Sequence, residues 1–289
     1  MTIEHAYAHF LPKPWGVIDL RPWSNAHQNR NIGEIWYERS SPVTDAPALL
    51  LKLLFTSQPL SIQVHPDDAY AQSKGLPKGK AEAWYVLSAT PGAKVALGLK
   101  RRLTSQQLRH ALNDGSISEL IAWQTVCAGE TIFVPTGTIH AIGAGVVVAE
   151  IQQRSDITFR LFDHGREREL HIEDAIAVAD PGPFDSRGTP TRLTDARTLL
   201  TSNLHFTFER IDLAQNSEWC LEAKEETWLL VVDGSARAGS INLAVGDAVF
   251  AQSDSIKIQA GEVGFSGLVA YRGAMAATLL RSADMETMQ

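Results

Sequence analysis

The sequence predicts a mainly β protein built from two β-barrels, the first of which carries a short helical insertion. Short apolar or alternating runs recur between residues 48 and 172, separated by Gly, Pro and polar turns, as in antiparallel sandwiches and barrels. Similar runs return after residue 190. With 289 residues, 44% of them hydrophobic and 20% charged, the chain has the composition of a folded protein and the length for two medium-sized domains.

Seven strands are expected in the first half of the chain. Each is a run of four to eight residues that is apolar throughout or alternates between apolar and polar side chains. They are Leu49–Phe55, Ser61–His65, Glu82–Ser88, Lys94–Leu99, Thr131–Pro135, Val146–Gln152 and Ile157–Phe162. This spacing favours an antiparallel sandwich or barrel.

A helical insertion, at about residues 103–122, interrupts these strands. Thr104 and Gln107 form a capping box, and apolar side chains follow at helical spacing until Asn113-Asp-Gly115 ends the helix. A second short helix is expected at Ser116–Ala122, and a third at Glu173–Ala179.

A stretch rich in Pro, Gly and Asp then predicts a boundary between two domains. We expect a first barrel at 1–180, a linker at 181–190 and a second β-domain at 191–289. Four strands are expected after the linker: His205–Leu213, Thr227–Val232, Ala248–Ala251 and Val269–Tyr271.

The two halves have the rhythm of a diverged repeat. The segments 129–135 and 246–252 match in pattern, but the first continues to His140 where the second arrives at Lys257. We therefore expect the second barrel to be a degenerate copy without a ligand cluster.

Charge and composition exclude several classes of protein. A net charge of −7 and a pI near 5.7 argue against binding to nucleic acid or anionic membranes, because both need an extended basic surface. Cys127 and Cys220 form no CxxC pair, which favours a reducing compartment. The N-terminus lacks the pattern of a signal peptide, and no apolar run reaches about 18 residues. We expect a cytoplasmic protein, and the sequence leaves its oligomeric state open.

Polar side chains recur at period two in two of the expected strands. Ser61, Gln63 and His65 would project from one face, as would Lys80 and Glu82. Ordinary polar residues or a solvated Lys/Glu pair would explain each group alone. Because unpaired polar groups inside a barrel cost several kcal/mol, their convergence would need water, hydrogen bonds or a metal ion.

A third segment adds another histidine. The pattern Gly129-x5-Pro135-x-Gly137-x2-His140 resembles the second signature motif of cupin barrels, although Ala144 stands where that motif has Asn. Combined, two imidazoles, a carboxylate and an amide suit Zn²⁺ or another first-row divalent ion with room for water or substrate. The proposed ligands are Gln63, His65, Glu82 and His140.

Four segments together resemble the type I mannose-6-phosphate isomerases. They are Ser61-Ile-Gln-Val-His-Pro-Asp-Asp68, Gly79-Lys-Ala-Glu-Ala-Trp-Tyr85, Val134-Pro-Thr-Gly-Thr-Ile-His140 and Ala149-Glu-Ile-Gln-Gln-Arg-Ser-Asp-Ile-Thr-Phe-Arg160, supported by Pro14-Trp-Gly16 and Ile32-Gly-Glu34. The resemblance covers about the first 180 residues and is closest to the short bacterial form. It implies two cupin-type jelly-roll barrels and one zinc ion per chain at the four ligands.

The resemblance also implies an activity, the interconversion of mannose 6-phosphate and fructose 6-phosphate through an enediol. It implies substrate-binding roles for Ser61, Lys80 and Arg160, and catalytic roles for Lys80, Glu150 and Arg160. Either Lys80 or Glu150 could transfer the proton. Arg160 could bind phosphate or stabilise the enediolate, or simply pair with Asp156 on the same strand face.

Two other classes of function fit the same residues. One is a non-enzymatic cupin that binds a sugar or a metal, which Lys80, Glu150 and Arg160 argue against. The other is a metal-cupin oxygenase, which would use similar ligands with Fe²⁺. The sequence leaves open which sugar is used and whether phosphate is required.

Overall fold

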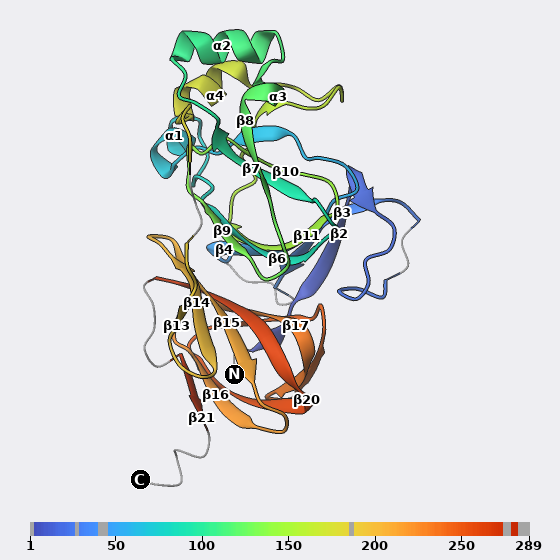
Figure 1. Ribbon diagram of the computed structural model, residues 1–289. Coiled ribbons are helices and arrows are strands. Elements are labelled where there is room, and N and C mark those ends of the chain that lie inside the picture. The colour runs from blue at the N-terminus through green and yellow to red at the C-terminus, as the bar shows by residue number, and fades with distance from the viewer. Residues whose placement is uncertain (1–2, 27–28, 40–45, 185–187, 274–278, 283–289) are drawn as a thin grey trace.

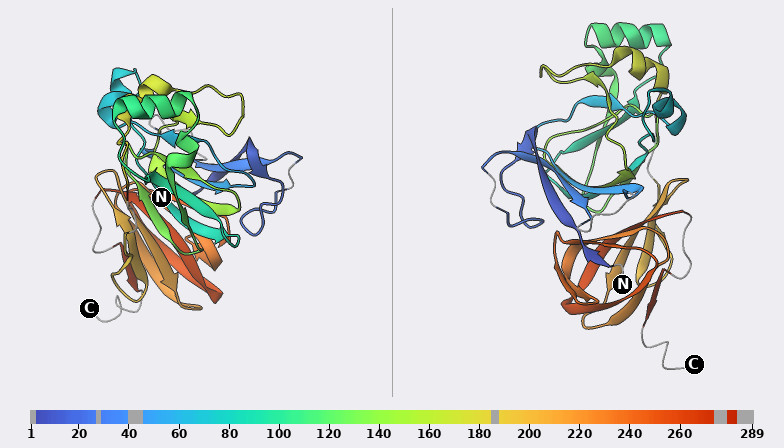
Figure 2. Two further views of the ribbon diagram at one scale, coloured as in Figure 1. Left: turned by 45° about the horizontal axis from the view of Figure 1, so that its top comes forward. Right: turned by 180° about the vertical axis from the view of Figure 1, so that it is seen from behind.

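The computed structural model describes residues 3–26, 29–39, 46–184, 188–273 and 279–282. It is mainly β, as predicted, and its described strands form three sheets. Figure 1 shows an upper body, formed mostly by the first 180 residues, and a lower body formed mostly by the C-terminal part. Figure 2 shows the same two bodies from two further directions, with the helices at the end far from the C-terminal body. The assignment of two barrels stays a prediction.

A six-stranded antiparallel sheet lies at the middle of the molecule. In order across the sheet, its strands are β2 (Tyr7–Val17), β3 (Ile32–Glu38), β4 (Leu49–Phe55), β11 (Val146–Gln153), β6 (Glu82–Ala89) and β9 (Thr131–Val134). Every residue of β4 is buried, which is expected of a strand that packs on both of its faces.

A five-stranded antiparallel sheet forms the outer wall of the upper body. Its strands, in order, are β12 (Phe159–Phe162), β5 (Ile62–Val64), β10 (His140–Ile142), β7 (Lys94–Leu99) and β8 (Ile121–Thr125). Helices α2 (Ser105–Asn113) and α4 (Ile172–Val178) share a hydrophobic core with its outer face. The remaining described helices are α1 (Asp68–Ser73) and α3 (Ile117–Leu120).

A ten-stranded antiparallel sheet makes up the lower body. Its main path runs through β1 (Glu4–His5), β19 (Ala248–Ala251), β17 (Thr227–Ala238), β20 (Asp254–Arg272), β15 (Phe206–Leu213), β14 (Arg197–Ser202) and β13 (Thr191–Arg192). Three strands branch from it: β16 (Glu218–Ala223), β18 (Ile241–Ala244) and β21 (Leu280–Ser282).

The six-stranded sheet has a separate core on each face. Leu51 and Leu53 on one face pack with Phe206 and Trp228 of the lower body. On the other face, Leu54 and Trp84 pack with Leu97 and Ile142 of the five-stranded sheet. The space between the six- and five-stranded sheets is therefore where inward-facing polar residues of the upper body meet.

The predicted elements agree with the structure at most positions. Leu49–Phe55, Lys94–Leu99 and Ala248–Ala251 are strands with the predicted bounds. The capping box of Thr104 and Gln107 is present at the start of α2.

Other boundaries were predicted wrongly. The helix expected at Ser116–Ala122 ends at Leu120, because Ile121 is the first residue of β8 and pairs with Leu99 of β7. The short strand expected at Val269–Tyr271 is the end of the 19-residue strand β20.

The first residues of the chain join the lower body, which the sequence did not predict. Glu4 and His5 form β1 and pair with Phe250 and Val249 of β19, so this short strand belongs to the sheet of the lower body. The division into 1–180, a linker and 191–289 stays a prediction, and residues 185–187 of the linker lie outside the described residues. Of the described helices, none is long and apolar enough to cross a membrane.

Candidate active site

Strand β5 presents Gln63 to the space between the two sheets of the upper body. Ile62 and Val64 pack into the core beneath the helices, so the alternation of the strand turns Gln63 the other way. Its cross-strand neighbours are His140 on β10 and Arg160 on β12. Three residues predicted from separate motifs therefore form one row across the five-stranded sheet.

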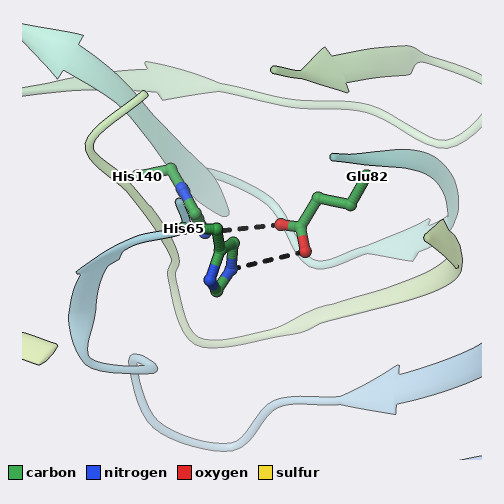
Figure 3. A group of neighbouring side chains, drawn as sticks. All are labelled: His65, Glu82 and His140. Carbon is green, nitrogen blue, oxygen red and sulfur yellow. Dashed lines mark ion pairs between the residues drawn. The ribbon is translucent and has the colours of Figure 1, made fainter. Parts of the chain in front are cut away.

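His140 of this row, together with His65 and Glu82, forms a buried group that could hold a metal ion. Their ligand atoms all lie within 4.8 Å of one another. Nε2 of His140 lies 3.3 Å from Oε1 of Glu82, and Nε2 of His65 lies 3.5 Å from Oε2 of the same carboxylate. Figure 3 shows the carboxylate of Glu82 facing the two imidazoles from the opposite side, with one ion pair drawn from each of its oxygens.

Hydrogen bonds fix the tautomer of both imidazoles. Nδ1 of His65 lies 2.9 Å from the carbonyl oxygen of Ile157, and Nδ1 of His140 lies 2.8 Å from that of Thr138. Because a carbonyl oxygen only accepts, each Nδ1 carries the hydrogen, and each Nε2 is left with a lone pair that can accept a hydrogen bond or bind a metal ion.

The electrostatics of the imidazoles match this arrangement. Burial, followed by the charge of Lys80, lowers the pKa of His65 well below its ordinary value. Burial lowers the pKa of His140 to about 4. Both rings are therefore neutral at pH 7, which is the form that binds a metal.

Glu82 supplies the observation that tests whether this group fits a cation. Its Oε1 is buried and has no hydrogen-bond partner, and Nε2 of His140, 3.3 Å away, carries no hydrogen to donate to it. A buried carboxylate oxygen without a donor is unfavourable unless a cation supplies the missing contact. The donor set of two imidazoles and a carboxylate fits a first-row divalent ion.

Lys80 brings a positive charge to the other oxygen of the same carboxylate. Its ammonium forms an ion pair with Oε2 of Glu82 and lies 3.0 Å from Nε2 of His65. Burial alone would lower the pKa of Lys80, but the carboxylates of Glu82 and Glu150 outweigh it and raise that pKa above its ordinary value. The group is therefore an ammonium ion at neutral pH.

Gln63 and Ser61 cover the group on the side of β5. The amide nitrogen of Gln63 donates to Nε2 of His140 at 3.2 Å, and Oγ of Ser61 donates to the amide oxygen of Gln63 at 3.3 Å. Both side chains thus lie at the candidate metal group, and the ligand role of Gln63 and the substrate-binding role of Ser61 stay predictions.

A second row of functional side chains crosses the six-stranded sheet. Glu150 on β11 lies between Lys52 on β4 and Trp84 on β6. Oε2 of Glu150 accepts from the indole N–H of Trp84 at 3.1 Å, and its Oε1 lies 3.4 Å from Nζ of Lys52. Burial, followed by the charge of Glu82, raises the pKa of Glu150 above its ordinary value.

A pocket of about 380 Å³ opens onto both rows. Its lining includes five of the site residues predicted from the sequence, together with charged residues that were not predicted. The five are Ser61, Gln63, Lys80, Glu150 and Arg160. His65, Glu82 and His140 lie beneath them and are almost completely buried.

Arg160 lies at one wall of this pocket, and its guanidinium is only partly hydrogen-bonded. Its Nη1 donates to the carbonyl oxygen of Glu169 at 2.8 Å, whereas its Nε is buried without a hydrogen-bond partner. Burial, followed by the charge of Arg168, lowers the pKa of Arg160 below its ordinary value. An anion that accepts hydrogen bonds from this guanidinium would satisfy Nε and would stabilise the positive charge of Arg160.

The pocket contains charged residues that sequence reasoning missed. Lys13, Glu34, Lys52 and Arg168 all line it. Glu34 lies 3.0 Å from Nζ of Lys13 and 4.0 Å from that of Lys52. Only Lys52 could have been found from the sequence. It is a lone lysine in the otherwise apolar run 49–55, and a buried lysine needs a polar or charged partner.

Comparisons with known proteins agree with the four-motif resemblance. No protein-family model matches the chain. A mannose-6-phosphate isomerase of Streptococcus mutans is 40% identical over 168 residues, which are 55% of this chain and 52% of the relative. A Bacillus subtilis protein provisionally named mannose-6-phosphate isomerase is 30% identical over 227 residues, covering 72% of this chain and 70% of the relative. The chain belongs to the type I mannose-6-phosphate isomerase family.

The solved structures agree on the fold of this isomerase family member. The crystal structure of the mannose 6-phosphate isomerase from Bacillus subtilis matches with a TM-score of 0.83 at 24% identity, over 94% of this chain and 100% of the other. In sequence, the match to the streptococcal mannose-6-phosphate isomerase spans about half the length of that relative.

Proposed function

We propose that this chain is a zinc-dependent aldose–ketose isomerase that interconverts mannose 6-phosphate and fructose 6-phosphate through an enediol. The observation that carries the proposal is the convergence of two neutral imidazoles, a carboxylate and an ammonium group beneath a pocket that also contains Glu150 and Arg160. The relatives named for this activity support the choice of substrate.

Four residues would hold one zinc ion per chain. His65, Glu82 and His140 would contribute the ligand atoms described above, and Gln63 would contribute its amide oxygen. The amide nitrogen and oxygen of Gln63 exchange places when the amide turns by 180°, so its contact with His140 is compatible with an oxygen ligand. When bound, zinc would supply Lewis acidity toward the carbonyl or hydroxyl oxygen of the sugar.

Arg160 and Ser61 would bind the substrate. The unsatisfied Nε of Arg160 and its place in the pocket lining suit a phosphate or an enediolate oxygen. Ser61 lies in the same lining with a hydroxyl that could donate to a sugar oxygen. These contacts would set the sugar chain across the pocket, with its reacting end toward Lys80.

Lys80 and Glu150 would share the proton transfer between C2 and C1. Lys80 holds its protons next to Glu82, so it can donate to a developing alkoxide. Glu150 is held by Trp84 and Lys52, so its carboxylate is fixed in the lining and can accept a proton. We assign the acid/base work to this pair jointly.

We further propose a cytoplasmic enzyme whose partner is a small sugar phosphate rather than nucleic acid or a membrane. The acidic net charge argues against an extended basic surface, and two cysteines without a CxxC pair fit a reducing compartment.

A coupled assay tests the proposed function. Purified zinc-loaded protein is given mannose 6-phosphate or free mannose, and ketose formation and oxygen uptake are followed. We expect turnover of mannose 6-phosphate without oxygen uptake. Oxygen consumption would instead support the oxygenase alternative, and binding without turnover would support a non-enzymatic cupin.

A further inference from the structure

Three consecutive backbone N–H groups around Lys80 are held by acceptors from two other segments, residues 66–68 and the end of β11. The N–H of Gly79 donates to Oδ1 of Asp68 at 2.8 Å. That of Lys80 donates to the carbonyl oxygen of Pro66 at 3.1 Å. The next residue, at position 81, donates to the side-chain oxygen of Gln153 at 3.0 Å. Two of the three acceptors are thus side chains.

Those two side chains are also joined to each other. The amide nitrogen of Gln153 donates to Oδ1 of Asp68 at 2.9 Å, so this oxygen accepts both from Gln153 and from Gly79. Burial opposes ionisation of Asp68, but these two hydrogen bonds outweigh it and lower its pKa. Asp68 begins α1 and Gln153 ends β11, so the pair links two rigid elements to residues 79–81.

The same segment packs directly on the chain that follows His65. A Cβ atom on Gly79 would lie 2.4 Å from the carbonyl oxygen of Pro66 and 2.5 Å from the carbonyl carbon of Asp67. This distance leaves no room for a side chain. The backbone before Lys80 is therefore held in contact with the segment that carries a candidate ligand.

We infer that Asp68 and Gln153 are positioning residues, which fix the backbone of residues 79–81 and thereby aim Lys80 and Glu82 into the active site. The inference rests on the proposed function, because it assigns the pair an effect on turnover. Neither side chain lines the active-site pocket. They act through the backbone, where a displacement of about 1 Å at a reacting group can cost two orders of magnitude in rate.

The pair lies at the boundary with the C-terminal part of the chain. Asp68 and Gln153 line a second pocket of about 470 Å³ together with His205, Glu225 and Arg272. The test therefore uses the full chain.

Asp68→Ala and Gln153→Leu each remove one acceptor from residues 79–81. We expect each to lower kcat tenfold or more while KM changes less than about threefold, because the substrate contacts stay in place. Asp68→Asn keeps an oxygen for both donors and should restore kcat to within about threefold of the wild type. The kcat of the double variant should be only slightly below that of the less active single variant, because both residues act on one segment.

Thr56→Val is the matched control for a purely structural effect. Thr56 is buried outside the active-site pocket, and its hydroxyl accepts from the N–H of Val146 at 2.9 Å. Its loss should lower the melting temperature without lowering kcat. If Asp68→Ala and Gln153→Leu behave in the same way, the inference is wrong.

Hydrogen exchange separates this inference from the proposed function. Amide exchange at residues 79–81 should accelerate in both variants, whether or not the protein isomerises mannose 6-phosphate. Unchanged exchange there would overturn the inference for any level of activity. If exchange accelerates in the variants but the wild type has no isomerase activity, the positioning role of Asp68 and Gln153 stands and the proposed function is refuted.

Discussion

Nζ of Lys80 lies 3.0 Å from Nε2 of His65, the nitrogen that would bind a metal ion. Nδ1 of His65 is committed to the carbonyl oxygen of Ile157, so Nε2 has one lone pair, which the ammonium occupies. A lone pair serves one partner at a time. Metal binding at His65 would therefore compete with this contact, and Lys80 would have to release His65 for a zinc ion to bind there.

Lys80→Met should separate zinc binding from turnover. The variant removes the competing ammonium, so zinc affinity should equal or exceed that of the wild type. The acid/base group is lost, so kcat/KM should fall by about two orders of magnitude or more. Zinc affinity is measured by competition with a chromophoric chelator, and turnover by the coupled assay.

Lys78→Met is the matched control, because Lys78 lies two residues away and lines the second pocket instead. It should change kcat/KM less than about threefold. Near-wild-type turnover by zinc-loaded Lys80→Met would refute the role of Lys80, and weaker zinc binding would refute the competition.

Arg160→Ala should lower kcat/KM for mannose 6-phosphate by about two orders of magnitude while zinc stays bound. A guanidinium that binds phosphate should affect mainly KM, whereas one that stabilises the enediolate should affect mainly kcat. Steady-state kinetics of the zinc-loaded variant distinguish the two roles. Unchanged kinetics would show that Arg160 serves neither.

The alternation of side chains was enough to predict much of this site. Ile62 and Val64 needed an apolar layer, so Gln63 had to face the other way, and the helices of the insertion supply that layer. The same reasoning placed Lys80 beside Glu82, and the two form an ion pair.

Partners from distant strands could not be predicted in this way. The run 49–55 indicated a buried strand with one lysine, but its pairing with β11 decides that Lys52 meets Glu150. Strand pairing depends on tertiary packing rather than on local pattern. For the same reason, the pairing of Glu4 with Phe250 was missed.

Trp84→Phe should test how Glu150 is held. The indole N–H donates to Oε2 of Glu150 at 3.1 Å, and the ring packs against His140 with centroids 5.6 Å apart. Phenylalanine keeps a ring there but loses the donor. Because a hydrogen bond to a charged group contributes about 1.5–3 kcal/mol, kcat should fall tenfold or more with zinc still bound.

Trp123→Phe is a suitable comparison, since Trp123 lies on β8 outside the pocket lining. It should leave kcat within about twofold of the wild type. Equal kinetics for the two variants would show that the Trp84 hydrogen bond does not contribute to turnover.

Glu209→Ala should destabilise the lower body without affecting the chemistry. Glu209 is fully buried and binds the guanidinium of Arg197 through two hydrogen bonds of 2.8 Å. Removing it takes away the carboxylate that pairs with this buried guanidinium, and breaking a buried ion pair costs about 3–5 kcal/mol. Chemical denaturation should show this loss, whereas kcat of the folded fraction should not change. A free energy of unfolding within about 1 kcal/mol of the wild type would contradict the contribution assigned to the pair of Glu209 and Arg197.

The most direct test of the account is a zinc titration of the metal-free protein, with the rate of fructose 6-phosphate formation as the readout. We predict no measurable rate without metal. The rate should then rise linearly with added zinc and stop rising at one zinc ion per chain. His140→Ala should give no such rise, because it removes one of the three buried ligand groups. Full activity in the rigorously metal-free protein would contradict the account.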